Sequence, residues 1–145
     1  MFKRLSSLLI FIEAVVISAA VRFTLSFLPA SFRLRWMGKP VTVDYTTKEV
    51  TSELQVALWK VKMAVARCNR YAPWNTECLT QALTAKWMLE QRQISSLLII
   101  GFRKDADGEI TGHAWLKAGD YFITGYRPDL EDYVINGRFG SQLNS

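Results

Sequence analysis

The hydrophobic period of the sequence changes near Leu97, and this change predicts the class of fold. Before Leu97, apolar residues recur every three to four positions in two segments, 52–68 and 77–93, as in helices that pack on a core. After Leu97, short apolar runs alternate with turn sequences such as Asp107-Gly108, as in β-hairpins. Helices followed by strands, with no internal repeat or linker, predict an α+β fold in which a helix packs on a small antiparallel sheet.

The boundaries of these elements follow from caps and turns. The helix after residue 51 is expected to begin with a capping box formed by Ser52 and Gln55. Cys68 falls on the apolar stripe of this helix, so we expect its thiol in the core. The strands are expected to form a meander over 97–102, 110–117 and 121–124, followed by a fourth short strand at 133–135.

The first part of the chain, residues 5–28, is apolar enough to resemble a membrane span or an export signal. Glu13 interrupts the apolar core that an export signal requires. In a spanning helix Glu13 and Arg22 would each cost about 2.5–3.5 kcal/mol near the bilayer centre. At helical spacing the apolar side chains fall on one face instead, which predicts an amphipathic helix that ends at Pro29. That face comprises Leu5, Leu8, Leu9, Ile12, Val16, Ala19, Ala20, Phe23 and Phe27.

The net charge of +5 is concentrated in the first forty residues. This segment carries six Lys or Arg against one Glu, whereas residues 41–145 carry twelve residues of each sign. A nucleic-acid-binding domain needs a basic surface on its folded body, so the distribution argues against such a partner. We therefore divide the chain into an apolar and basic helical segment, 1–40, and a body, 41–145. The apolar face of the segment, or the aromatic and basic residues 32–36 after it, is expected to contact protein or a membrane surface.

The small number of cysteines and histidines limits the chemistry of the chain. Cys68, Cys78 and His113 are all that the sequence contains, so neither a disulfide scaffold nor a closed zinc site of Cys and His is expected. We expect no metal and no cofactor.

Cys78 and His113 form a candidate catalytic pair. Cys78 falls in the first turn of the 77–93 helix, where unpaired backbone amides and the helix dipole favour a thiolate. His113 falls on the strand that returns from the first hairpin, where an imidazole would serve as a general base. The alternative from these residues alone is a buried cysteine and an unrelated histidine.

The surroundings of both residues resemble a known family. The matching residues are Pro73-Trp74-Asn75-Thr76-Glu77-Cys78-Leu79-Thr80-Gln81-Ala82-Leu83, Met88-Leu89, Ile100-Gly101 and Gly112-His113-Ala114-Trp115-Leu116. Together they resemble the transglutaminase-like leader peptidases of lasso-peptide biosynthesis, closely over residues 73–125. The N-terminal helix and Gly137-Arg138-Phe139-Gly140 are similar to the stand-alone protease form of that family. The resemblance implies a transglutaminase- or papain-like core in residues 41–145, with Cys78 as nucleophile and His113 as base.

One departure from the family pattern leaves the third catalytic role open. Many members have an Asp about twelve residues after the His, where this chain has Gly125. The candidates for orienting the imidazole are therefore Thr124, Asp120, Asp129 or a backbone carbonyl. Trp74, just before the nucleophile, is a candidate substrate contact, and Gln81 is a candidate oxyanion donor, whereas Trp115 is expected to fill the core.

The resemblance implies a cysteine peptidase that cleaves the leader from a lasso-peptide precursor. Its implied partners are the precursor peptide, a separate leader-recognition protein and an asparagine-synthetase-like cyclase that uses the freed amine. The alternatives are a transglutaminase-type acyltransferase, which would use the same pair, and a catalytically inactive module that binds leader or partner. We expect a cytoplasmic protein, with membrane association through the N-terminal helix as an open question.

Overall fold

The computed structural model describes residues 2–27, 29, 31, 37–41, 51–73 and 77–141. The three long helices are α1 (Phe2–Phe27), α3 (Ser52–Tyr71) and α4 (Cys78–Gln91). The strands and the short 3-10 helix η1 occur in the order β1 (Lys39–Pro40), β2 (Leu97–Lys104), β3 (Ile110–Ala118), β4 (Tyr121–Thr124), η1 (Leu130–Asp132) and β5 (Val134–Gly140). The predicted α+β class with an antiparallel sheet is confirmed.

The sheet has the order β1-β5-β2-β3-β4, and its neighbouring strands pair antiparallel. The predicted meander is confirmed for β2, β3 and β4. It is wrong for the last strand, because β5 returns to the opposite edge of β2 and begins at Val134. The segment after Gly125, which includes η1, makes this crossing, and β1 then pairs with the outer edge of β5. Pro40 is tolerated in β1 because an edge strand needs fewer backbone donors.

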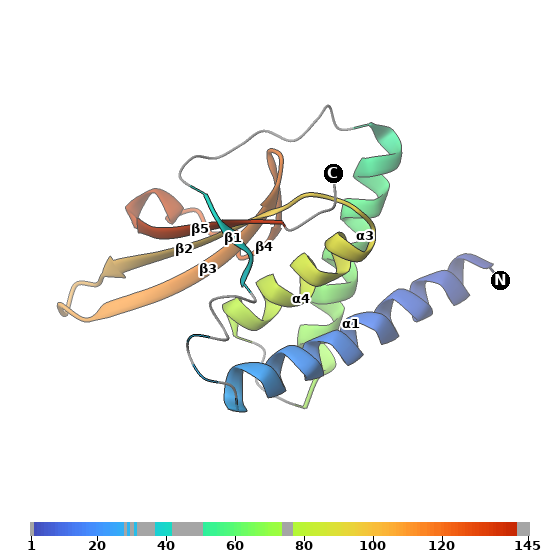
Figure 1. Ribbon diagram of the computed structural model, residues 1–145, viewed down its shortest axis with the longest axis horizontal. Coiled ribbons are helices and arrows are strands. Elements are labelled where there is room, and N and C mark those ends of the chain that lie inside the picture. The colour runs from blue at the N-terminus through green and yellow to red at the C-terminus, as the bar shows by residue number, and fades with distance from the viewer. Residues whose placement is uncertain are drawn as a thin grey trace.

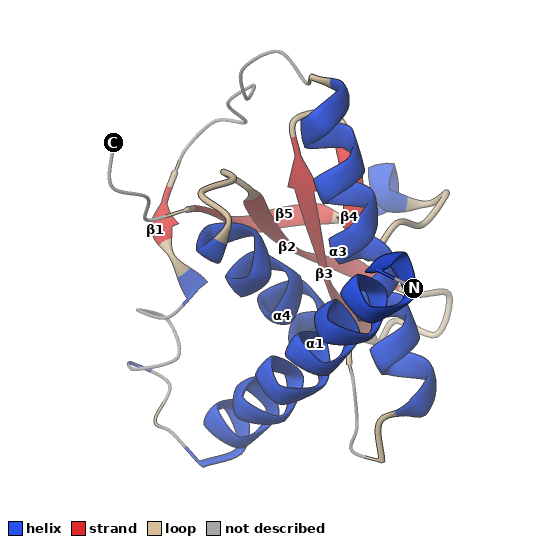
Figure 2. Ribbon diagram, turned by 90° about the vertical axis from the view of Figure 1, so that its right-hand side faces the viewer, coloured by secondary structure: helices blue, strands red, loops and turns tan. Residues whose placement is uncertain are grey.

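The elements form three layers (Figure 1). The sheet is one layer, α3 and α4 pack on one of its faces, and α1 crosses the outer side of α3 and α4. In the view of Figure 2, α1 therefore lies in front of both helices and the sheet lies behind them. The main core lies between the helices and the sheet, and it includes Cys68, Met88, Leu98, Ala114 and Leu116. A second cluster on the other sheet face consists of Leu97, Ile99, Trp115 and Tyr133.

The cap of α3 differs from the prediction by one residue. Thr51, in extended conformation, is the N-cap, and its hydroxyl accepts a hydrogen bond from the Leu54 amide at 3.2 Å. Gln55 instead donates through Nε2 to the Tyr121 hydroxyl at 2.8 Å, which ties α3 to β4. The signal was ambiguous because both Thr51 and Ser52 are good capping residues.

The N-terminal helix is present, but its most apolar face points outward. Its buried residues are Ala14, Ile17, Ser18 and Val21, which pack toward α3 and α4. Glu13 lies beside this buried face and accepts hydrogen bonds at 2.7 Å from both terminal nitrogens of Arg92, just after α4. Most of the predicted apolar face is exposed, and residues 32–36 lie outside the described residues. Packing on the rest of the protein therefore uses the face of α1 opposite the predicted stripe, and Ile10, Phe11 and Ile17 on that face contact the core.

Candidate active site

Cys78 is the first residue of α4. Glu77 precedes it as the N-cap, in extended conformation, so the Cys78 amide lies in the first helical turn, where backbone donors have no partner within the helix. The side chain is half-buried and packs against the main core. Cys68, by contrast, is only 2% exposed, and burial raises the pKa of its thiol although a hydrogen bond with Ser18 lowers it. Of the two thiols, Cys78 is the accessible one.

The His113 ring is held by a backbone carbonyl. His113 lies in β3 opposite Gly101 of β2, and its Nε2 atom lies 2.7 Å from the carbonyl oxygen of Gly125. A carbonyl oxygen only accepts hydrogen bonds, so Nε2 must carry the proton. In the neutral ring Nδ1 then keeps a free lone pair.

Two aromatic rings also contact the imidazole. Trp115 stacks on the His113 ring with centroids 5.9 Å apart, and Tyr133 lies at 5.7 Å in a tilted arrangement. Both aromatic side chains are buried, as expected for Trp115. The Tyr133 contact was not predicted, because it depends on how the chain crosses from β4 to β5, and local patterns in the sequence do not encode that crossing.

Gly125 can accept no side chain in this conformation. Its φ is +78°, and a Cβ atom would lie 2.5 Å from the Ala114 carbonyl oxygen and 2.8 Å from the Trp115 Cβ. The residue thus lies directly against β3, where it turns its own carbonyl to the His113 ring. This backbone therefore excludes a carboxylate side chain at position 125.

The side chains predicted as orienting residues have other surroundings. Thr124 Oγ1 is buried and has no hydrogen-bond partner among the described residues, and Asp120 is exposed in the turn between β3 and β4. Asp129 accepts hydrogen bonds from Arg127 and Arg103, and the hydrogen bond from Arg127 lowers the pKa of this carboxyl. In the described part of the chain, the Gly125 carbonyl is the hydrogen-bond partner of the imidazole, and none of these side chains is.

The structure says less about the two other predicted site residues, the oxyanion candidate Gln81 and the substrate-contact candidate Trp74. Gln81 lies one turn into α4 and is half-buried. Its backbone amide donates a hydrogen bond to the Glu77 backbone carbonyl at 3.0 Å. Trp74 lies outside the described residues. Across residues 2–27, 37–41, 51–73 and 77–141, no group of three or more His, Cys, Asp or Glu is arranged to hold a metal ion.

The fold brings the elements of the candidate pair together. Helix α4 packs against β3, and both views show the N-terminal end of α4 at the end of the layers where β3 begins (Figures 1 and 2). Cys78 contacts the main core, which includes Ala114, whereas His113 shares the other face of β3 with Trp115. Within the described chain no hydrogen bond joins the Cys78 thiol to the imidazole, so their pairing stays a prediction.

Comparison with known proteins identifies the family of this fold. The model of the transglutaminase-like superfamily, whose members are typically cysteine proteases or acyltransferases, matches residues 22–136. The match covers most of the chain and includes both Cys78 and His113. No curated protein and no solved structure matches the sequence at a significant level. The chain belongs to the transglutaminase-like superfamily.

Proposed function

We propose that this protein is a cysteine peptidase that removes the leader from a lasso-peptide precursor, with Cys78 as nucleophile and His113 as general acid and base. The observation that carries the proposal is the fixed tautomer of the only histidine. Because Nε2 donates to Gly125, the neutral ring offers Nδ1 as the base. A backbone carbonyl suffices for this role in a Cys–His pair, since the resting pair is already charged and depends less on a carboxylate than a serine enzyme does.

The two side chains would meet at the edge of β3. Among the described residues, strand β4 pairs with β3 only from Leu116 onward. The part of β3 before Leu116 therefore has no strand partner on the β4 side among these residues. The His113 ring is held at this edge by Gly125, and α4 begins near the same end of β3. The catalytic contact is often long in unliganded enzymes and shortens when substrate binds.

The reaction is a two-step hydrolysis. The Cys78 thiolate attacks the carbonyl carbon at the junction of leader and core, and amides of the first turn of α4 stabilise the oxyanion. The carbon–nitrogen bond breaks as protonated His113 gives its proton to the departing core amine. Water then loses a proton to His113 and attacks the thioester, which releases the leader as a carboxylate and regenerates the thiol.

The choice of substrate and partners is supported by the sequence resemblance alone. The stand-alone proteases of that family act with a separate leader-recognition protein, and the amine that they free is the nucleophile that a cyclase needs. We therefore propose both proteins as partners, together with a cytoplasmic location. A binding module without catalysis is disfavoured by the accessible thiol at the helix start.

The test is the mass of the products formed from a precursor peptide. The purified chain is incubated with a lasso-peptide precursor and a leader-recognition protein, for which the neighbouring genes are searched. Hydrolysis predicts free leader acid and free core amine, whereas an acyltransferase would give a leader joined to an added amine. Cys78→Ala and His113→Ala should each abolish cleavage, and Cys68→Ala is the matched control that keeps it. Full cleavage by Cys78→Ala would refute the mechanism.

A further inference from the structure

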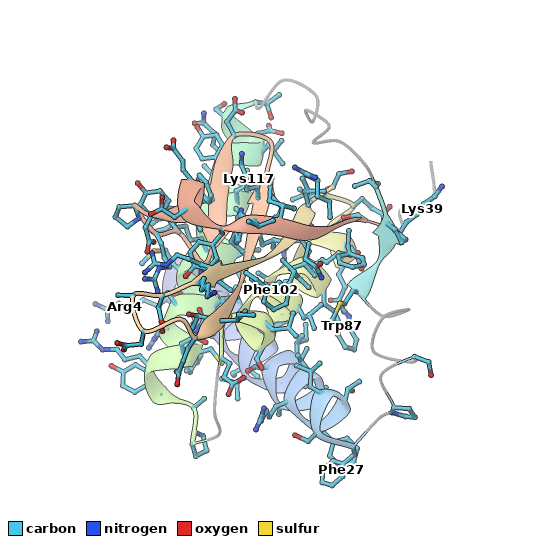
Figure 3. All side chains as sticks on the ribbon, turned by 90° about the vertical axis from the view of Figure 1, so that its left-hand side faces the viewer. Arg4, Phe27, Lys39, Trp87, Phe102 and Lys117 are labelled. Atoms are coloured by element: carbon cyan, nitrogen blue, oxygen red, sulfur yellow. The ribbon has the colours of Figure 1, made fainter. Side chains whose placement is uncertain are left out.

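The outer face of α1 is a continuous apolar surface that the described part of the chain does not cover. Its large side chains stay exposed although they form the most hydrophobic stripe of the sequence, and Val16, Phe23 and Phe27 are 62%, 64% and 71% exposed. Leu5, Leu8, Leu9 and Ile12 extend the same surface toward the N-terminus. In Figure 3, Arg4 and Phe27 lie near the two ends of α1, and Phe27 projects from the end of the helix. A surface of this length indicates a binding partner.

The inner side of α1 faces α3, and its Ile10 and Phe11 also pack against the main core. A groove of about 960 Å³ separates the first half of α1 from α3, and Phe11 and Met63 are among its apolar lining residues. Trp59, 62% exposed, and Val56 also line it, so apolar side chains run from one helix to the other. The groove and the outer face of α1 are therefore separate surfaces.

At helical spacing, Arg4 and Arg22 lie beside the apolar stripe of α1, and further cations lie on α3. Lys60, Arg67 and Arg70 line the groove, and the Arg67 guanidinium lies 4.6 Å from the centre of the Phe11 ring. The described side chains of α1 and α3 include six cations and two carboxylates, and one of these carboxylates, Glu13, is paired with Arg92. The cations are Arg4, Arg22, Lys60, Lys62, Arg67 and Arg70.

We propose that the outer face of α1 binds the surface of an anionic membrane, with α1 lying in the plane of the interface. An apolar stripe bordered by Lys and Arg is the chemistry that acyl chains and acidic headgroups together recognise. A second copy of the chain would bring two cationic surfaces together, which is unfavourable. A transmembrane path for Arg4–Phe27, which is long and apolar enough to cross by length and composition, would break the Glu13–Arg92 ion pair and uncover the buried side of α1.

Vesicle binding by the purified full chain tests this proposal independently of any peptidase activity. The chain should sediment with vesicles of phosphatidylcholine and phosphatidylglycerol, and much less with phosphatidylcholine alone. Val16→Glu should reduce binding at least tenfold, because a buried carboxylate opposes insertion of the stripe. Val134→Glu is the matched control, since Val134 is 74% exposed on β5, on the opposite side of the molecule, and this variant should bind as the wild type does.

Two further variants test how much positive charge contributes to vesicle binding. Arg4→Gln and Arg22→Gln, on α1 beside the stripe, should each weaken binding about fivefold, and added salt should weaken it further. Equal binding to both kinds of vesicle, or equal binding by Val16→Glu and wild type, would overturn the proposal. A dimer that Val16→Glu dissociates would also overturn the proposal, since a second copy would then be the partner. Vesicle-bound protein that resists extraction by alkaline carbonate would overturn it too, since α1 would then span the bilayer.

Discussion

The Gly125 carbonyl holds the His113 imidazole in the described part of the chain. It is the acceptor for His113 Nε2, and the positive φ and close approach to Ala114 admit no side chain. The sequence alone showed that the Asp was missing and that a backbone carbonyl was one possible substitute. Which atom orients the imidazole depends on the backbone conformation at Gly125, and the sequence alone does not specify that conformation.

Substitution of Gly125 should therefore be costly whatever residue replaces it. Gly125→Ala is expected to lower stability by about 1–3 kcal/mol from left-handed backbone strain alone, with a further cost from the contact with Ala114. Gly125→Asp should not raise activity although it restores the family residue. Urea unfolding and leader cleavage measure the two effects, and Gly108→Ala, at a hairpin tip with more space around the residue, is the control. A more active Gly125→Asp would show that the backbone can accommodate a carboxylate.

Cys68 gives a prediction about alkaline stability. Burial raises the pKa of its thiol in the folded chain above the unfolded value. Its contribution to stability is therefore complete below the unfolded pKa, about 8.5, and is lost as the pH rises toward the folded pKa. The free energy of unfolding of the wild type should fall more steeply above that pH than that of Cys68→Ala. Parallel pH profiles for the two chains would contradict this account.

At the scale of elements, periodicity predicted α3, α4 and the β2–β3–β4 meander, because each is determined by local pattern and turn residues. It did not predict the route of β5 or the orientation of α1. For α1 the rule that the most apolar face packs inward failed, since Ala14, Ser18 and Val21 let the helices approach closely while larger side chains face out. A stripe of small residues on the other side of the helix was the available signal.

An ion pair in α4 is also expected to affect stability asymmetrically. Lys86 is only 3% exposed and pairs with Glu90 one turn later. Glu90→Gln would leave a buried ammonium group without its partner and should cost up to about 3 kcal/mol, whereas Lys86→Met should be nearly neutral or stabilising. Urea unfolding of both variants measures the difference. The opposite order of stability would mean that the ammonium group finds enough solvent or other acceptors on its own.

At the scale of the whole molecule, the helical layer of α1 is a part of the packed structure. Val21 and Ile17 lie in the same core as Leu58 and Met88, and the family match begins at residue 22, inside α1. The distribution of charge along the sequence suggested a boundary at residue 41. That residues 41–145 form a separate body stays a prediction.

Removal of residues 1–27 tests that division. Because α1 covers apolar side chains of α3 and α4, the truncated chain should expose them and lose its cooperative unfolding transition. Circular dichroism during urea unfolding is the measurement, with binding of a hydrophobic dye as the second readout. A truncated chain that unfolds cooperatively with wild-type stability would show that residues 28–145 fold without α1.

The central claim is that His113 activates the Cys78 thiol. The most direct measurement is the rate at which iodoacetamide alkylates Cys78 near pH 6, followed by intact mass in a Cys68→Ala background. A thiolate–imidazolium pair predicts rapid alkylation in the presence of His113 and at least about tenfold slower alkylation in His113→Ala, because a free thiol is almost wholly protonated at that pH. Equal rates in the two chains would contradict the claim.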